Sequence, residues 1–374
     1  MSVNKDKALQ RLRTNEWLQR PTSAPAQKNS GDLSVDQPTH PLAAALIVAA
    51  VAALEGGETH YADVPGISSL RQAVAAWLNQ TVNEGGFTLD HILITAGIQE
   101  ARFLTIQGLG ETLGRIAVPE VVHPGARQAF AVRAFDFMPL PVSKALGLLP
   151  ALEAIRAVLE DGARTLFLES PSRLTGAIYP PAQVRELAAL IDTYDAAVIW
   201  DQGLAPWVTP AQYTSLADTS SAAQRVATIG ELWPGIGLES WQIGYSGAPM
   251  AWVKQMQVQK QVISICTNTA VQYAALAAAD TVIQAQQAVQ ARISDVRMKI
   301  VDTLHDYGVT PMKGAASNVI AIPVFGSSGA LARAQKAGFS LADGALFGAP
   351  EMLRLSATPT DASLQAVKQL FTSE

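Results

Sequence analysis

Residues 164–208 constrain the fold more than any other part of the chain. This segment contains two short apolar runs, 166–168 and 196–200, with the length and composition of strands in a parallel sheet covered on both faces. Between them, Pro180 and Pro181 open a stretch whose apolar residues recur at helical spacing. We therefore expect a strand–helix–strand unit with parallel strands. The residues on the apolar face of the helix are Val184, Leu187, Leu190 and Ile191.

Polar residues follow both predicted strands. The sequence ESPSR occupies residues 169–173 after the first strand, and Asp201, Gln202 and Gly203 follow the second. Open parallel sheets bind their ligands at the carboxyl ends of the strands. Asp201 is therefore a candidate ligand group, although its position fits equally well a carboxylate that only caps the next turn.

The composition allows a large core and argues against several classes of partner. With 374 residues, 49% of them hydrophobic and 16% charged, the chain is long enough for two or three domains. A net charge of −5 and a pI near 5.6 give no basic excess, so we expect neither a nucleic-acid nor an anionic-membrane partner. The single cysteine, Cys266, favours a reducing compartment, and the five scattered histidines predict no metal site.

The N-terminal region suggests an arm and then a buried helix. Residues 7–18 predict a short helix without the apolar core of a secretory signal, and a Pro/Ser/Asn-rich connection follows it. The most apolar run, 41–54, has fourteen residues, fewer than the roughly 20 that span a bilayer. We expect a buried helix there, a further helix capped by Ser68 or Ser69, and a cytoplasmic protein.

The order of elements predicts two domains after the arm. From residue 92, apolar strands alternate with amphipathic helices, which indicates a doubly wound sheet. A long amphipathic helix at 281–306 is followed by two further strand–helix pairs, which is typical of a smaller α+β unit. The predicted division is an arm at 1–31, a large α/β domain at 32–250, and the linking helix with the small domain at 251–374. Within the large domain, we expect residues 32–60 to contribute to the small domain or to an interface.

Seven segments together resemble a known family. In chain order they are HYADVPGISSLRQAVAAWL, TAGIQEA, VVHPGARQAF, SPSRLTG, VIWDQG, LESWQIGY and MLRLSAT. From about residue 32 onward, the chain resembles the class I and II aminotransferases, pyridoxal-phosphate enzymes of fold type I. The resemblance implies a three-layer α/β large domain with a mainly parallel sheet, a smaller α+β C-terminal domain and a homodimer.

The resemblance also implies a role for individual residues. Asp201 matches the carboxylate that keeps the pyridine nitrogen of the coenzyme protonated, so that the ring acts as an electron sink. Gly97, Ile98 and Gln99 match the helix N-terminus that binds the coenzyme phosphate.

Two more matches lie outside the sheet unit. Tyr61 matches a tyrosine that reaches the phosphate of the neighbouring subunit, and Arg354 matches the arginine that binds the substrate α-carboxylate as a bidentate fork. A core-edge aromatic ring and a surface ion pair are the structural alternatives. Around the coenzyme ring, His123 replaces the stacking aromatic, Arg173 replaces an asparagine, and Leu204 replaces a tyrosine.

The main departure is the missing nucleophile. The family's Schiff-base lysine corresponds to Pro234, and residues 145–253 contain no lysine, so we expect no covalent coenzyme and name no catalytic residue. Nearby, Glu231 and Trp233 replace two serines, and Gln242 replaces an arginine. Each change of charge beside the phosphate costs roughly 4 kcal/mol before relaxation, at about 4 Å and an effective dielectric constant of about 20.

Three hypotheses follow from these departures. In the first, the chain keeps the aminotransferase fold and dimer but binds the coenzyme weakly or not at all, and has a binding, regulatory or structural role. Arg173 and Arg354 would then suit a small carboxylate. In the second, an enzyme acts on an amino acid or keto acid with noncovalently held pyridoxal or pyridoxamine phosphate, and His123 or another base moves the proton. In the third, ordinary transamination uses a lysine from elsewhere in the chain.

Overall fold

The computed structural model describes most of the chain. The described residues are 32–34, 43–80, 86–109, 114–133, 137–219, 223–324, 327–358 and 361–372. The arm predicted at 1–31, including its helix at 7–18, lies outside them. None of the described helices has both the length and the apolar character needed to span a membrane.

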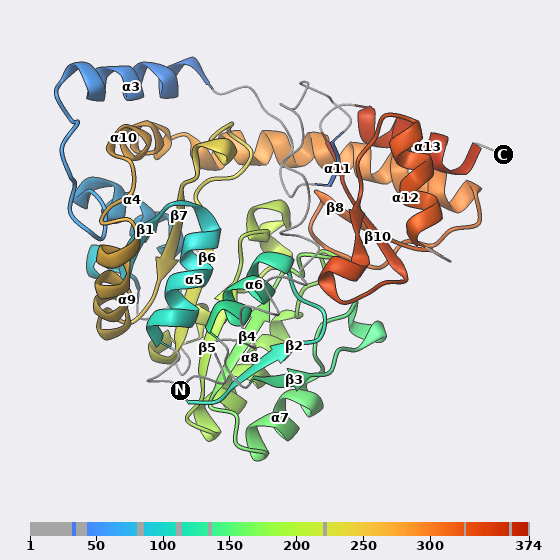
Figure 1. The fold of residues 1–374 in the computed structure, drawn as a ribbon, viewed down its shortest axis with the longest axis horizontal. Coiled ribbons are helices and arrows are strands. Elements are labelled where there is room, and N and C mark those ends of the chain that lie inside the picture. The colour runs from blue at the N-terminus through green and yellow to red at the C-terminus, as the bar shows by residue number, and fades with distance from the viewer. Residues whose placement is uncertain are drawn as a thin grey trace.

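A seven-stranded sheet forms the centre of the larger domain (Figure 1). Only β7 runs opposite in direction to the other strands, so the sheet is mainly parallel. The strands are almost completely buried, as expected for a sheet covered on both faces. The predicted α/β class is confirmed. In spatial order the strands are β1 (Ile92–Thr95), β7 (Gly244–Gly247), β6 (Val226–Glu231), β5 (Ala197–Asp201), β4 (Thr165–Glu169), β2 (Ile116–Pro119) and β3 (Met138–Leu140).

Helices cover both faces of this sheet. On one face, α5 (Gly97–Leu109) and α6 (Pro124–Arg133) pack on the side chains of Phe167 and Ile199. On the other face, α7 (Leu152–Glu160) and α8 (Pro181–Thr193) pack on the intervening residues of the same strands. Because strand side chains alternate between faces, Asp201 points to the α5 face, as Ile199 does.

The apolar helix expected to be buried is α3 (Ala44–Glu55), and that expectation is wrong for one face of it. It packs chiefly on α10 (Thr269–Ala278), and its opposite side is left outside the domain (Figure 1). The large apolar side chains exposed on α3 are those of Ile47, Val48, Val51 and Leu54. The next helix, α4 (Ser68–Asn79), begins after Ile67 rather than behind a serine cap, and the N–H of Ile67 donates to Gln272 Oε1 at 2.8 Å.

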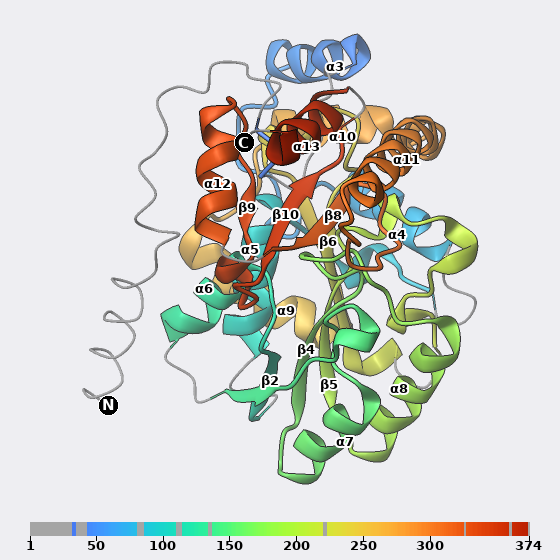
Figure 2. The same ribbon diagram turned by 90° about the vertical axis from the view of Figure 1, so that its right-hand side faces the viewer.

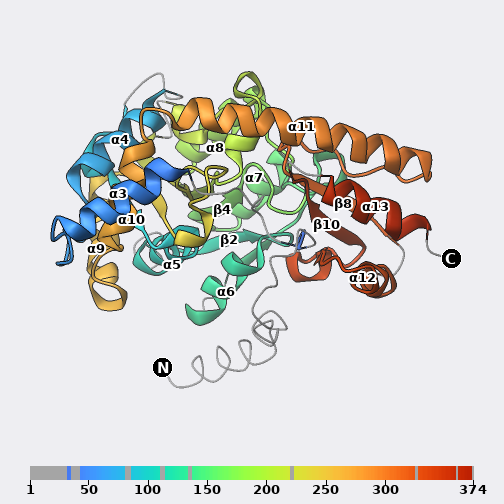
Figure 3. The same ribbon diagram turned by 90° about the horizontal axis from the view of Figure 1, so that it is seen from above.

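The smaller domain contains a three-stranded antiparallel sheet and helices. The long helix α11 (Val282–Asp306) runs from the large domain across to this sheet (Figure 3). Figure 2 shows the three strands of the small sheet side by side. Asp32 bridges to Ser340, which joins the start of the described chain to the small domain. The other elements are β8 (Val319–Pro323), β10 (Met352–Ser356), β9 (Ala342–Asp343), α12 (Ser327–Lys336) and α13 (Ala362–Thr372).

The helix that follows residue 250, α9 (Met250–Ile263), packs on α5 of the large domain. Helix α10 likewise packs on α3 and α4. The sheet of the small domain therefore begins only after α11. The division of the chain at residue 250 stays a prediction.

Candidate active site

Asp201, at the end of β5, binds two arginine side chains at once. Its Oδ2 accepts hydrogen bonds from Nε and Nη2 of Arg102, on α5, at 3.1 and 2.7 Å. Its Oδ1 accepts from Nε and Nη2 of Arg173 at 3.1 and 2.6 Å, and from the N–H of Gly203 at 3.1 Å. Each carboxylate oxygen is therefore engaged by one guanidinium.

Glu231, at the end of the adjacent strand β6, binds the outer edge of Arg173. Its Oε1 accepts from Nη1 and its Oε2 from Nη2, both at 3.0 Å. The Arg173 side chain is completely buried between the two carboxylates. Gly203 lies against this contact so closely that a Cβ there would collide with Arg173 Nη2 and Glu231 Oε2. The space between β5 and β6 at this edge is therefore filled by the protein itself.

Two carboxyl groups in the cluster have pKa values shifted in opposite directions. Burial alone raises the pKa of Asp201, but the charges of Arg173 and Arg102 outweigh burial and lower that pKa to about 2. Burial raises the pKa of Glu169, at the end of β4, to about 7, and the nearby charge of Asp201 adds to the effect. Asp201 is therefore the ionised partner of the arginines.

His123 lies at the rim of the cluster. Its Nδ1 accepts a hydrogen bond from the N–H of Gly125 at 3.0 Å, so Nδ1 is the unprotonated nitrogen of the ring. The same Nδ1 is 3.0 Å from Arg102 Nη1, and the His123 N–H donates to Glu169 Oε1 at 2.8 Å. The ring packs edge-to-face on Phe347, with centroids 5.7 Å apart. The Gly125 N–H and the Arg102 guanidinium thus already contact His123 Nδ1, the ring nitrogen nearest the cluster.

The N-terminus of α5 binds an internal carboxylate. Glu100 Oε2 accepts from the Ala96 N–H at 2.5 Å and from Lys260 Nζ at 2.7 Å. A carboxylate at a helix N-terminus is favoured by the helix dipole. Gly97, whose φ of 72° suits glycine, faces Gln242 so closely that a Cβ there would lie 2.8 Å from its Oε1.

The other two predicted phosphate residues differ in accessibility. Ile98 is half-buried and Gln99 is exposed. Gln99 Nε2 donates to the Gly125 carbonyl at 2.7 Å, and its Oε1 accepts from Arg102 Nη1 at 3.3 Å. Its side chain therefore links α5 to the first turn of α6.

The segment that corresponds to the family's lysine forms a buried loop after β6. Trp233 has a positive φ of 53° and is completely buried in an apolar cluster. Pro234 is also buried, and its carbonyl accepts from Gln286 Nε2 on α11 at 3.1 Å. Lys260 is the one fully buried lysine among the residues that the structure describes.

The two predicted residues outside the cluster differ in exposure. Arg354, on β10, is completely buried, and its Nε donates to the Arg173 carbonyl at 2.8 Å. Its guanidinium also lies 5.9 Å from the centroid of Phe347. Tyr61 is 78% exposed in the loop after α3. The structure thus brings Arg354 next to the cluster and leaves Tyr61 outside it.

Sequence reasoning missed Arg102, the second arginine on Asp201. The sequence contained one weak signal for it. Arg102 lies three residues after Gln99 in a predicted helix, so the two side chains share a face of that helix. Glu169 was noted only as a polar strand end. Among the described residues, no three His, Cys, Asp or Glu side chains are grouped to hold a metal ion.

The sheet order, the polar cluster at the carboxyl ends of β4, β5 and β6, and the small antiparallel domain define a fold type I α/β protein. The chain belongs to the aminotransferase class I and II family, whose model matches residues 29–370. The predicted resemblance is therefore confirmed.

Several named relatives are similar to this chain. It is 27% identical to arginine–pyruvate transaminase AruH of Pseudomonas aeruginosa over 219 residues, which cover 59% of this chain but only 56% of that relative. It is 25% identical to a probable aspartate/prephenate aminotransferase of Aquifex aeolicus over 334 residues, which cover 82% and 81%. The structure of the aromatic aminotransferase from Pyrococcus horikoshii has the same fold, with a TM-score of 0.83, 19% identity and coverage of 91% and 94%.

Proposed function

We propose that this aminotransferase-family protein is not a working transaminase and serves a small-molecule binding, regulatory or structural role. One observation carries the proposal: the Arg173 guanidinium is completely buried between Asp201 and Glu231. Breaking a buried ion pair leaves an uncompensated charge and costs about 3 to 5 kcal/mol. A coenzyme that needed this space would have to supply that energy without a covalent bond.

The residues present do not fit pyridoxal phosphate at its ring. The family's carboxylate receives the protonated pyridine nitrogen, but both oxygens of Asp201 already accept hydrogen bonds from guanidinium groups. A cationic pyridinium would also lie beside the guanidinium groups of Arg102 and Arg173. Like charges at such distances repel each other, which weakens binding further.

The phosphate position is equally unfavourable. Glu100 already lies at the N-terminus of α5, where its Oε2 accepts from Ala96 N–H, and Lys260 neutralises it. Gln242, which replaces the family's arginine, brings an amide rather than a cation to Gly97. A phosphate dianion would therefore compete with an internal carboxylate for the helix dipole.

The second candidate is an enzyme with noncovalently held pyridoxal or pyridoxamine phosphate, acting on an amino acid or keto acid. The relatives favour it more directly than the first proposal, because the names of AruH and of the Aquifex protein describe aminotransferases. The coenzyme, when bound, would supply the electron sink. Arg173 would have to leave Asp201, and the His123 Nδ1 would have to release Gly125 before accepting a proton there.

We also propose a cytoplasmic homodimer. Apolar residues exposed on two helices support the dimer, with Val48 on α3 66% exposed and Val262 on α9 82% exposed. Exposed apolar side chains grouped on a helix, as on each of these two helices, commonly mark a protein interface. A small carboxylate stays the proposed ligand of Arg173 and Arg354, and would have to compete with Glu231 for the first of these.

The test combines spectroscopy and trapping on the purified full chain. The protein is titrated with pyridoxal phosphate, its near-ultraviolet and visible spectrum is recorded, and borohydride treatment is followed by peptide mass spectrometry. We expect neither an aldimine band nor a reduced adduct. A spectral change with amino-donor turnover but without trapping would support the second candidate. A stoichiometric adduct on one lysine, such as Lys260, together with amino-donor turnover would overturn the first proposal and restore ordinary transamination.

A further inference from the structure

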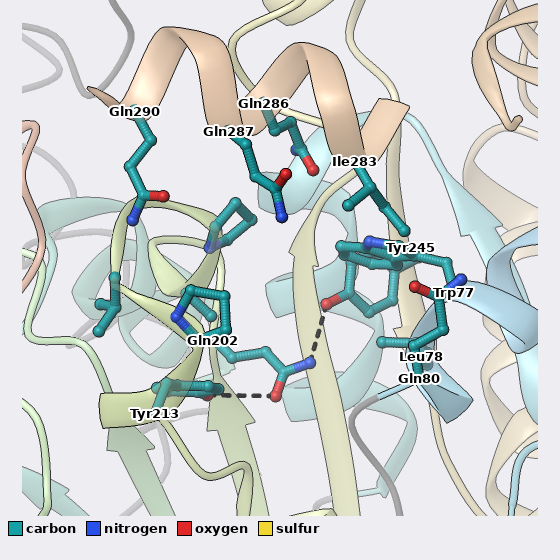
Figure 4. Close-up of a pocket in the computed structure, with 14 residues that line it drawn as sticks. Trp77, Leu78, Gln80, Gln202, Tyr213, Tyr245, Ile283, Gln286, Gln287 and Gln290 are labelled. Carbon is teal, nitrogen blue, oxygen red and sulfur yellow. Dashed lines mark hydrogen bonds between the residues drawn. The ribbon is translucent and has the colours of Figure 1, made fainter. Parts of the chain in front are cut away.

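A pocket, shown in Figure 4, lies on the opposite face of the sheet from the Asp201 cluster. It has a volume of about 320 Å³ and lies between the end of α4, the loop after β5 and the large-domain part of α11. Gln202 lines it, directly after Asp201 in the chain, but its side chain points to the other face. The pocket is lined by Trp77, Leu78, Gln80, Gln202, Ala205, Pro206, Val208, Pro210, Tyr213, Tyr245, Ile283, Gln286, Gln287 and Gln290.

Side-chain amides dominate the polar lining of this pocket. Ile283, Gln286, Gln287 and Gln290 are spaced at i, i+3, i+4 and i+7, so one face of α11 points into it (Figure 4). Gln286 is held by its bond to the Pro234 carbonyl, whereas Gln287 is exposed and Gln290 half-buried. The helix therefore presents neutral donors and acceptors to the cavity.

The floor of the pocket is a fixed network of neutral groups. Gln202 Nε2 donates to Tyr245 Oη at 3.0 Å, and Gln202 Oε1 accepts from Ser215 Oγ at 2.7 Å and from Tyr213 Oη at 3.3 Å. Burial raises the pKa values of Tyr213 and Tyr245 well above the usual range of tyrosine, so both side chains stay neutral. A network held in this way presents rigid polar groups to a ligand.

Aromatic side chains provide flat apolar surface beside these amides. Trp77 packs edge-to-face on Tyr245, with ring centroids 5.6 Å apart and planes at 89°. Ligand pockets are commonly lined by aromatic and apolar groups with a few fixed polar ones, and volumes of about 300 Å³ are at the small end of their range. The pocket therefore has the size for one or two fused rings.

The charge of the lining selects among ligands. None of the fourteen residues carries a formal charge. A charged ligand buried there would lose hydration without gaining a counter-charge, which is strongly unfavourable. A neutral ring with an amide edge can instead match donors and acceptors with Gln287 and Gln290 while it packs on Trp77.

We propose that the pocket formed by α4, α11 and the loop after β5 binds an uncharged planar ring that carries an amide group. The binding site is separate from the Asp201 cluster and does not depend on whether the chain is a transaminase. It gives the protein a ligand whose chemistry differs from the charged amino acids and phosphorylated coenzyme that the family resemblance implies for the Asp201 cluster.

The test measures the binding of two matched pairs of probes to the full chain by isothermal titration calorimetry and saturation-transfer NMR. Nicotinamide and uracil are the uncharged probes, and nicotinate and orotate are their carboxylate counterparts. We expect both neutral probes to bind and their carboxylates to bind at least tenfold more weakly. If neither neutral probe binds at millimolar concentration, or if each carboxylate binds as well as its neutral partner, the proposal is wrong.

Variants on α11 locate the site. Gln287→Leu and Gln290→Leu remove one neutral hydrogen-bonding group each and should weaken binding roughly fivefold. Gln284→Leu is the matched control, because Gln284 is an exposed residue of the same helix and does not line the pocket. Binding that is unchanged in both pocket variants, or is weakened equally by the control, would place the ligand elsewhere and overturn the proposal.

Discussion

Replacing Arg173 by leucine tests whether the cluster is a closed, self-sufficient structure. The substitution leaves Glu231 without the guanidinium that donates to both its oxygens and leaves Asp201 with Arg102 and the Gly203 N–H as its donors. Loss of one partner from a buried ion pair typically costs about 3 to 5 kcal/mol. The Glu231 side chain is 12% exposed and Asp201 keeps one cation, so we expect a loss of about 3 kcal/mol, the lower end of that range.

The assay is chemical denaturation at neutral pH. It is monitored by both tryptophan fluorescence and circular dichroism, so that separate unfolding of the two domains is detected. The double variant Arg173→Leu/Glu231→Leu removes both members of one pair. Because replacing both partners with apolar groups is often nearly neutral, it should recover about 1 to 2 kcal/mol relative to Arg173→Leu. A single variant that loses less than about 1 kcal/mol, or a double variant with simply additive losses, would refute the closed cluster.

Two further predictions concern the same region. Glu169, with a folded pKa of about 7 against 4.5, binds more protons in the folded state, so its contribution to stability falls as the pH rises from about 4.5 to 7. Glu169→Gln should make the denaturant midpoint depend less steeply on pH, whereas Glu186→Gln, at an exposed residue, should not change that dependence. Part of the dependence should remain in both variants, because burial also raises the pKa of Asp218 to about 7. Pro234→Lys should restore no measurable transamination, because Arg173 still fills the ring position, and rapid turnover of an amino donor by that variant would contradict this account.

Local patterns were sufficient to predict the framework of the large domain. The proline-opened helix is α8, with Val184, Leu187 and Ile191 buried as its spacing required. Strands β4 and β5 are buried along their whole length and pair in parallel. These features depend on short-range periodicity and on the need to cover both faces of a parallel sheet.

The outer face of α3 could not be predicted in the same way. Its composition indicates burial, because the helix is apolar all round. In the structure only the side towards α10 is covered, and Val48 stays exposed. The composition indicates that other elements must pack on such a helix. How much of its surface is covered within one chain depends on the packing of elements that are distant in the sequence.

The sequence by itself determined the order of strands and helices along the chain, the polar residues at the carboxyl ends of two strands and the absence of a lysine at Pro234. Only the tertiary structure decided that Arg102 meets Asp201 across 99 positions of the chain and that Arg173 points inward to Glu231. The reason is physical. Local spacing fixes which face of a strand or helix a side chain occupies, whereas a buried ion network forms only after packing brings charges from separate elements together, where each must find a partner.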